Sequence, residues 1–182
     1  ISGGGTNLQA IIDETKSGGI NGTVKLVISN KENAYGLERA RLSKIKAVYE
    51  TDEDKIIELL KENNIDLIVL AGYLKIITPK FVDEFRNKII NIHPSLLPKY
   101  GGKGMYGVKV QEAVLRNHEK YAGCTVHYVD SEIDTGEIIA QKKILVMENE
   151  SAWELGGRVF NEEIILLPLA IKHIREAMKV IP

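Results

Sequence analysis

An asparagine and a histidine two positions apart could together form a reaction centre. Asn91 and His93 follow segment 88–90, which is typical of a short buried strand. Residues i and i+2 of a strand point to the same side, so the two side chains can be aimed at one point. An amide NH2 and a protonated imidazole are both hydrogen-bond donors, which suits them to the oxyanion of a tetrahedral intermediate in acyl transfer. Pro94 and Pro98 prevent a helix and stiffen the loop that follows.

The same pair also has an ordinary structural interpretation. A strand-end asparagine can close a turn and a histidine can satisfy a buried polar group, so a lone Asn-x-His motif is only a hypothesis. Ser95 stands between Pro94 and Leu96 with no base assigned to it. We therefore expect no covalent enzyme intermediate, and the proposed chemistry needs no metal.

A second candidate site is the glycine-rich segment 3–5. Its glycines would let the backbone approach a ligand closely, and Thr6 and Asn7 begin a predicted helix over 8–16. The free N–H groups and the dipole of a helix N-terminus favour an anion such as phosphate. The segment is not the dinucleotide fingerprint, because Leu8 replaces the third glycine, and it lacks the Lys-Ser/Thr of a P-loop. A tight turn between a strand and a helix remains the alternative.

Several other polar or reactive residues have simple structural interpretations. The loop 130–136 is typical of a solvated acidic turn. Cys124 precedes a β-branched run and is expected to be a buried, inert thiol. His127 is expected to be a half-exposed strand residue. Trp153 is expected to anchor the last helix on the sheet.

The elements that would position these residues alternate between strand and helix. Strand patterns occur at 24–28, 46–49, 67–70, 88–90, 124–129 and 138–146, and helical patterns at 8–16, 34–42, 53–63, 81–85, 107–117 and 151–178. Thr78 and Ser151 are expected N-caps, and Pro168 is expected to break or bend the last helix. The alternation predicts an α/β domain with a largely parallel sheet, except for an antiparallel last pair.

Length and composition are those of a small globular domain. The 182 residues are 44% hydrophobic and 27% charged, which fits a single domain over 1–182. A formal charge of -1 gives no general attraction to nucleic acid or to an anionic membrane. One cysteine excludes an internal disulfide and a multi-cysteine zinc site. With no run of ~20 apolar residues and no signal peptide, the cytoplasm is the expected location. Because Ile1 directly precedes the glycine loop, we expect most of the first strand to lie outside the sequence.

The stretch 91–98 resembles the signature of the folate-dependent formyltransferases. Further matches are spread along the chain at 2–8, 71–73, 91–100, 123–141 and 163–168. Several ordered matches are more specific than one motif. The resemblance implies a Rossmann-like formyltransferase fold, with a mostly parallel central sheet, helices on both faces and an antiparallel C-terminal portion.

The resemblance is strongest to members that act in de novo purine biosynthesis. It implies transfer of the formyl group from 10-formyltetrahydrofolate, as cosubstrate, to the amine of glycinamide ribonucleotide. The catalytic residues would be Asn91, His93 and Asp134, with the carboxylate holding His93 and favouring its charged form. The partners would be small molecules, with no nucleic acid or membrane, and the oligomeric state is left open between monomer and homodimer.

The binding residues of the family also match positions in this chain. The ribonucleotide would be held by Gly5, Thr6, Asn7 and Glu163, and the folate by Leu74, Lys75, Ile76, Ile77, Asn91 and Ile133. The resemblance places His127 near the site and makes Leu97-Pro98 an expected cis peptide. Between Tyr49 and Asp52 the chain is shorter than the family pattern, and an arginine that often binds folate has no counterpart there.

Three alternatives remain at this point. A formyltetrahydrofolate hydrolase would use a similar centre with water as nucleophile. Another folate-dependent formyltransferase, such as the methionyl-tRNA enzyme, would need a further domain and a basic surface. A non-catalytic phosphosugar-binding module would need the glycine loop but has no use for Asn91, His93 and Asp134 together.

Overall fold

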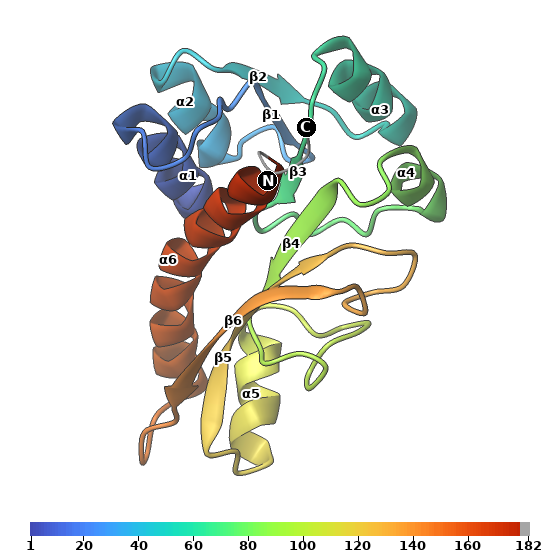
Figure 1. Ribbon diagram of the computed structural model, residues 1–182. Helices are drawn as coiled ribbons and strands as arrows, with labels where there is room; N and C mark the ends of the chain where they lie inside the picture. The colour runs from blue at the N-terminus through green and yellow to red at the C-terminus, as the bar shows by residue number, and fades with distance from the viewer. Residues whose placement is uncertain (179–182) are drawn as a thin grey trace.

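The computed structural model describes residues 1–178, and strands and helices alternate along them as the sequence predicts. In chain order the elements are α1 (Thr6–Ser17), β1 (Leu26–Ser29), α2 (Tyr35–Leu42), β2 (Lys46–Tyr49), α3 (Glu53–Glu62), β3 (Ile68–Leu70), α4 (Pro79–Glu84), β4 (Ile89–His93), α5 (Val108–Arg116), β5 (Tyr121–Tyr128), β6 (Ile138–Leu145) and α6 (Ala152–Met178) (Figure 1). The boundaries differ from the predicted ones by a few residues, as is usual where helix and strand ends fray.

The helix starts follow their capping residues. Thr78 Oγ1 accepts a hydrogen bond from Phe81 N at 3.3 Å, and Pro79 is the first residue of α4. Ser151 Oγ accepts from Glu154 N at 3.1 Å at the start of α6. Both predicted N-caps are confirmed, because each hydroxyl satisfies an N–H group that the helix itself leaves free.

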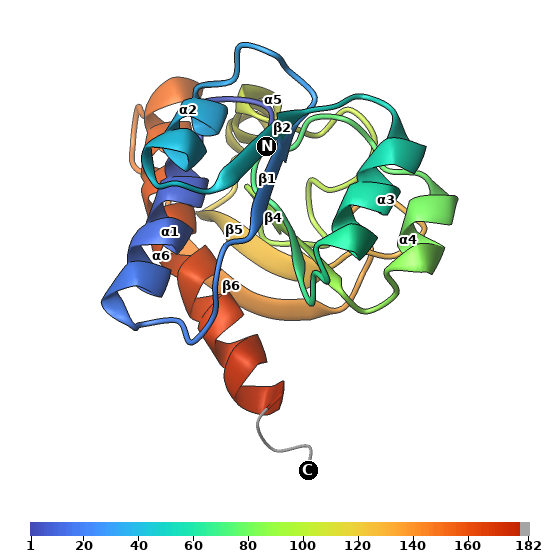
Figure 2. The ribbon, with the colours of Figure 1, turned by 90° about the horizontal axis from the view of Figure 1, so that it is seen from above.

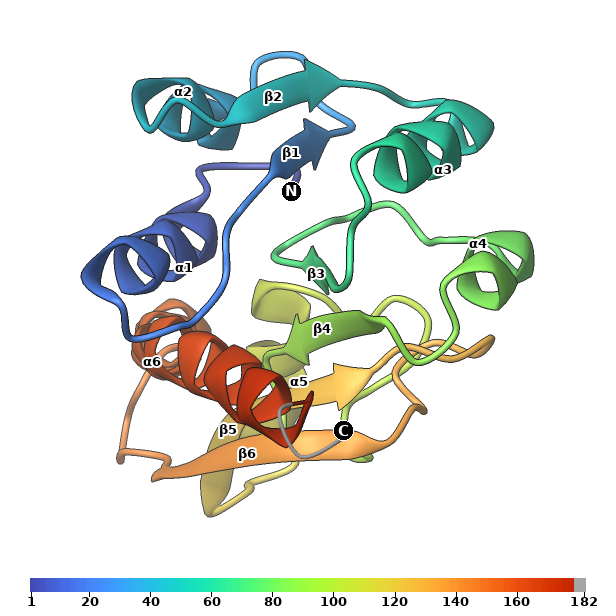
Figure 3. The ribbon, with the colours of Figure 1, turned by 45° about the horizontal axis from the view of Figure 1, so that its top comes forward.

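The strands form a mixed arrangement in two sheets. β1 pairs with β2 in parallel, and a second sheet has the order β3-β4-β5-β6. β3 and β4 are parallel, whereas β5 is antiparallel to both β4 and β6. The expected antiparallel C-terminal portion is therefore confirmed. β1 and β3 lie next to each other but are not paired (Figure 3).

Helices cover both faces of the strands, as expected. Viewed from above, α3 and α4 lie on one side, and α1, α2 and α6 lie on the other (Figure 2). Ile56 and Leu60 of α3, at helical spacing, pack with Phe81 of α4. On the opposite face, Ile11 of α1 and Leu167 of α6 belong to a second buried cluster. This cluster includes strand residues Ile90 and Val126, so the sheet carrying Asn91 and His93 is firmly supported.

The long helix α6 bears on two expectations. The chain stays helical through Pro168, so of the expected break or bend only the break is excluded. Trp153 is 78% exposed, which makes its expected role as an anchor wrong. The side of α6 that packs inward carries Leu155 and Val159 at i, i+4 spacing, both fully buried, and Trp153 lies outside that stripe.

Cys124 lies in the same buried cluster as Leu155 and Val159. It is fully buried, and burial raises the pKa of its thiol to about 12, with the carboxylates of Glu163 and Glu162 adding to the rise. The predicted burial of the thiol is confirmed, and the raised pKa favours its protonated form, whereas the thiolate is the reactive one.

Candidate active site

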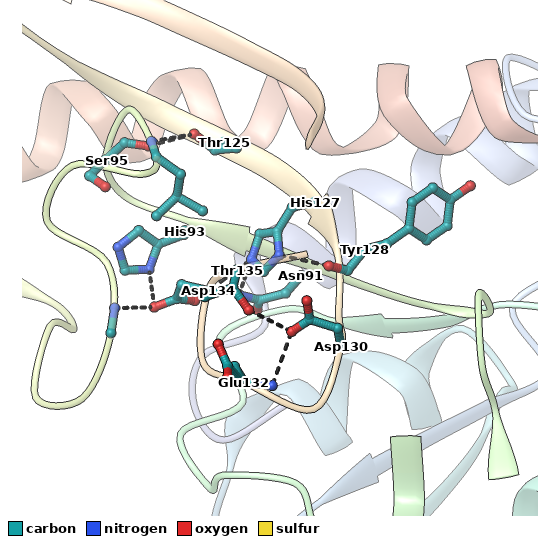
Figure 4. A network of polar contacts seen from close by, with 12 residues as sticks. Asn91, His93, Ser95, Thr125, His127, Tyr128, Asp130, Glu132, Asp134 and Thr135 are labelled. Carbon is teal, nitrogen blue, oxygen red and sulfur yellow. Dashed lines mark hydrogen bonds and ion pairs between the residues drawn. The ribbon is translucent and has the colours of Figure 1, made fainter. Parts of the chain in front are cut away.

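Strand β4 positions Asn91 and His93. Ile89 and Ile90 are fully buried and fix the strand within the sheet. The strand continues to His93, further than segment 88–90, and keeps the alternation that directs both side chains to one side (Figure 4). In the register with β5, Asn91 lies opposite His127.

His93 is buried and both of its ring nitrogens face oxygen acceptors. Nε2 lies 2.8 Å from Tyr100 O, and Nδ1 lies 3.4 Å from Asp134 Oδ2. A neutral imidazole has one N–H and satisfies only one of these contacts, whereas an imidazolium donates to both. The site therefore accommodates a protonated histidine whose donors are engaged by the protein itself.

Asp134 joins two loops at the buried end of this network. Its Oδ2 accepts a hydrogen bond from Gly102 N at 3.1 Å in addition to facing His93, and its side chain is 9% exposed. The residue has a φ of 58°, a left-handed conformation that aspartate tolerates better than most residues. The prediction of a solvated turn is therefore wrong for this residue.

The rest of the same loop is organised by a different carboxylate. Asp130 Oδ1 accepts hydrogen bonds from Glu132 N at 3.0 Å and Thr135 Oγ1 at 2.7 Å (Figure 4). This local turn leaves Asp134 free to face the histidines.

His127 orients the amide of Asn91. It is 2% exposed, so the expectation of a half-exposed residue is wrong. Its Nε2 lies 3.1 Å from Asn91 Nδ2 and its Nδ1 lies 3.0 Å from Tyr128 O. Burial lowers the pKa of His127 and outweighs the opposing effects of the Tyr128 carbonyl and of Asp134. The neutral ring thus donates from Nδ1 and accepts from the Asn91 amide, which assigns the tautomer from the network.

The loop after β4 is held by hydrogen bonds from β5 and β6. Leu97-Pro98 is a cis peptide, as expected. Thr125 Oγ1 accepts from Leu97 N at 3.1 Å, and Gln141 Nε2 donates to Leu97 O at 2.9 Å. Ser95 Oγ donates to Lys99 O at 2.6 Å, so its hydroxyl proton is directed at a carbonyl. The serine is therefore a structural residue of this loop.

Gly5 is required by packing as well as by the turn. It has a φ of 75° at the N-cap of α1, and a Cβ there would lie 2.6 Å from Gly36 Cα. Around Gly3 and Gly4 a Cβ would meet nothing within 4 Å. α1 begins at Thr6 without a side-chain cap, so the N–H groups of its first turn remain available for an anion.

Asn7 and Glu163 form a buried polar pair behind this loop. The side chain of Asn7 is 6% exposed and donates a hydrogen bond to the Glu163 carboxylate. Burial raises the pKa of Glu163 to about 7, although the bond from Asn7 acts in the opposite direction. Asn7 Oδ1 is buried with no partner. Because the amide is turned towards Glu163, the backbone N–H of Asn7 is the group left to face an anion.

Segment 74–77, which the sequence predicts to bind folate, leaves the sheet beside β4. It follows β3, whose Leu70 is paired with Asn91 of the parallel strand β4. Leu74 and Ile76 are 64% and 63% exposed. Carboxyl ends of neighbouring parallel strands share one edge of a sheet, which is where ligands bind in such folds.

Two further contacts tie this segment to the rest of the edge. Leu74 N donates to Ser2 Oγ at 2.9 Å, and Lys75 Nζ donates to Thr51 O at 2.7 Å, within the connection between β2 and α3. Ile133 is 38% exposed on the loop that carries Asp134. Exposed apolar side chains are thus available at this edge for a flat aromatic ligand.

Sequence reasoning missed three residues that build the site. Tyr100 and Gly102 contribute main-chain atoms, for which a residue type gives no signal. Arg39 donates from Nε to Gly4 O at 2.6 Å and supports the glycine loop from a position 35 residues away. Only the fold brings these groups together.

Among residues 1–178, no group of three or more His, Cys, Asp or Glu side chains is arranged to hold a metal ion. Over the same part of the chain, no helix is long and apolar enough to cross a membrane.

Comparison with known proteins places the chain in one family. A sequence model described as formyl transferase matches residues 1–171. The phosphoribosylglycinamide formyltransferase of Haemophilus influenzae is 45% identical over 186 residues, which cover 97% of this chain and 85% of that protein. The chloroplastic phosphoribosylglycinamide formyltransferase of Arabidopsis thaliana is 41% identical over 173 residues, covering 90% of this chain. The chain spans 59% and 55% of the lengths of two plant relatives.

Solved structures agree with the sequence comparison. The crystal structure of glycinamide ribonucleotide transformylase 1 from Symbiobacterium toebii matches with a TM-score of 0.90 at 39% identity, covering 97% of this chain and 85% of that one. The fold, the match to the family model and the identity to these relatives all agree, and the chain belongs to the formyl transferase family.

Proposed function

We propose that the protein transfers a formyl group from 10-formyltetrahydrofolate to the amine of glycinamide ribonucleotide. The observation that carries this proposal is the network in which Asn91, His93 and Asp134 meet on one side of β4. Relatives named phosphoribosylglycinamide formyltransferase support the choice of substrates.

The reaction is a direct transfer between two nitrogens. The unprotonated amine attacks the formyl carbon, and the carbonyl oxygen becomes an oxyanion. The Asn91 amide and imidazolium His93 donate hydrogen bonds to that oxygen. The carbon–nitrogen bond to the folate then breaks as the proton of the attacking nitrogen passes to the leaving nitrogen, carried by His93 or a water. Asp134 balances the charge on His93 throughout.

The contact between His93 and Tyr100 must break before His93 can stabilise the oxyanion. His93 Nε2 is hydrogen-bonded to Tyr100 O, so it must give up this carbonyl in order to donate to the oxyanion. Tyr100, Gly102 and Gly104 all have positive φ values, in a segment with three glycines where conformational change meets little steric resistance. We infer that substrate binding shifts this segment away from His93.

The substrates would bind at the two ends of the same sheet edge. Gly5, Thr6 and the backbone of Asn7 would hold the ribonucleotide phosphate at the start of α1, with Glu163 behind them. Segment 74–77 and Ile133 would contact the pterin of the folate. The proposed partners are soluble small molecules, and we propose the cytoplasm as the location.

An absorbance assay of folate deformylation, run with and without glycinamide ribonucleotide, tests this function. We expect turnover to depend on the ribonucleotide, because its amine is the nucleophile. Equal turnover with water alone would assign the protein to the hydrolases instead. Phosphosugar binding without any deformylation would favour a non-catalytic module.

A further inference from the structure

The helix α2 holds the glycine loop by two of the loop's main-chain carbonyls. Gly36 N donates a hydrogen bond to Gly3 O at 3.0 Å, and Arg39 Nε donates to Gly4 O at 2.6 Å. Figure 3 shows the segment that leads into α1 running beside α2. The first contact is made by the main chain, whereas the second is made by a side chain and therefore depends on Arg39.

These contacts determine where the N–H groups of the loop point. In a planar trans peptide, the N–H of one residue is directed opposite to the C=O of the residue before it. Because Gly3 O and Gly4 O are turned towards α2, the N–H groups of Gly4 and Gly5 are directed away from it. Gly5 O accepts from Gln9 N at 2.8 Å, so Thr6 N–H points out of the start of α1. Successive N–H groups that are oriented in this way can form an anion-binding concavity.

Arg39 also brings a positive charge to this loop. Within residues 1–178 its guanidinium makes no ion pair, whereas Nη1 of the neighbouring Arg41 lies 3.7 Å from Glu38 Oε2. Arg39 is half-buried, and its guanidinium carbon lies 5.0 Å from the centre of the Tyr35 ring. An arginine stays protonated in proteins, and salt screens a partly buried charge less than an exposed one. The charge is therefore available to an anion that binds at the loop.

The side chain of Arg39 is held against the loop by further contacts. A Cβ on Gly5 would lie 3.3 Å from Arg39 Cδ, so the arginine passes directly beside the loop. Its Nη1 lies 3.5 Å from Gln9 Oε1, which is on the first turns of α1. A lysine would carry the same charge but lacks the planar set of donors that contacts Gly4 and Gln9 together. The geometric role and the charge of Arg39 can therefore be separated by substitution.

We propose that Arg39 is a positioning residue that orients the Gly4 peptide and supplies the charge by which the glycine loop selects a phosphorylated substrate. The inference rests on the proposed function of this loop, and it names a residue outside the loop that sets its specificity. A substrate without the phosphate would use neither the oriented N–H groups nor the charge. Arg39 should therefore matter for the ribonucleotide and not for the corresponding riboside.

Steady-state kinetics of Arg39→Met with glycinamide ribonucleotide, and with the riboside that lacks its phosphate, test the proposal. We expect KM for the ribonucleotide to rise about tenfold or more, because interactions with a charged group are lost. The KM for the folate, kcat, and kcat/KM for the riboside should change less than about twofold. Arg41→Met is the matched control and should leave all of these values unchanged. An equal loss with the two substrates would overturn the proposal, since Arg39 would then support only the fold.

Arg39→Lys tests the charge apart from the geometry. It retains the positive charge beside the loop but not the planar guanidinium, so it should recover part of the loss in KM for the ribonucleotide. A KM as high as that of Arg39→Met would overturn the role of the charge. Melting temperatures close to that of the unchanged chain would show that both variants fold.

Binding of ribose 5-phosphate, followed by NMR of the backbone amides, tests the same inference without turnover. We expect the amide signals of Gly4, Gly5 and Thr6 to shift in the unchanged chain, and to need about tenfold more ligand in Arg39→Met. Ribose alone should shift none of them. Equal affinity in the two proteins, or no shift in the unchanged chain, would overturn the proposal. If the binding results hold while no formyl transfer is detected, the proposed function fails and the role of Arg39 in phosphate binding stands.

Discussion

At the scale of single residues, the amide of Asn91 is the donor whose orientation the protein fixes most clearly. His127 accepts from its Nδ2, which leaves the second N–H of the amide for an oxyanion. Replacing Asn91 with alanine should lower kcat by about two to three orders of magnitude, because losing one preorganised oxyanion donor typically costs ~2.7 to 4 kcal/mol. Steady-state kinetics, together with thermal unfolding followed by circular dichroism, would distinguish a loss of catalysis from misfolding. A drop in kcat below tenfold in a folded variant would remove Asn91 from the mechanism.

The charge of Asp134 can be tested within its own loop. Asp134→Asn keeps an acceptor for Gly102 N but removes the negative charge that faces His93. We expect kcat to fall by orders of magnitude while the melting temperature changes little. Asp130→Asn is the matched control, since Asp130 closes the turn through Glu132 and Thr135 and lies outside the ion pair of His93 with Asp134. Similar losses in both variants would indicate that loop order, rather than charge, supports turnover.

Glu163 should make stability depend on pH. Its pKa is raised from 4.5 to about 7 in the folded protein, so the folded state holds the proton more tightly than the unfolded state. The associated stability is fully present below pH 4.5 and is lost as pH rises through 7, by on the order of 3 kcal/mol. Glu163→Gln should reduce the difference between the free energies of unfolding measured in urea at pH 5 and at pH 8. A difference as large as that of the unchanged protein would show that another group is responsible.

At the scale of elements, two variants of the glycine loop before α1 can distinguish a glycine needed for packing from a glycine needed for phosphate binding. Gly4→Ala adds a methyl group where nothing lies within 4 Å, whereas Gly5→Ala meets Gly36 and a φ of 75°. Gly4→Ala should raise KM for the ribonucleotide severalfold with unchanged stability, because the methyl group hinders close approach of phosphate. Gly5→Ala should lose about 1 kcal/mol or more of stability. An unchanged KM for Gly4→Ala would indicate that the loop is only a turn.

Sequence patterns predicted helix starts and strand alternation well where these depend on neighbouring residues. The caps Thr78 and Ser151, and the alternation in β4, depend on neighbours in sequence. Trp153 was mispredicted because its exposure depends on which stripe of α6 meets the sheet, and the burial of Asp134 depends on Gly102 from another loop. Contacts of this kind are tertiary and leave no periodic pattern.

At the scale of the whole molecule, the family resemblance located the candidate residues, and the fold explains how they act together. Asn91 and His93 come from β4, Asp134 comes from the loop between β5 and β6, and Glu163 comes from α6. The order of the strands β3-β4-β5-β6 had no counterpart in the predicted elements, because strand patterns specify strands without specifying their neighbours.

The most direct test of the central claim follows the formyl carbon itself. A single turnover is run with 10-formyltetrahydrofolate carrying a ¹³C-labelled formyl group, with glycinamide ribonucleotide, and with either the unchanged chain or His93→Ala. We expect the label to appear on the amine of the ribonucleotide with the unchanged chain, and orders of magnitude more slowly with the variant. Label recovered as free formate, or transfer at an equal rate by both proteins, would contradict it.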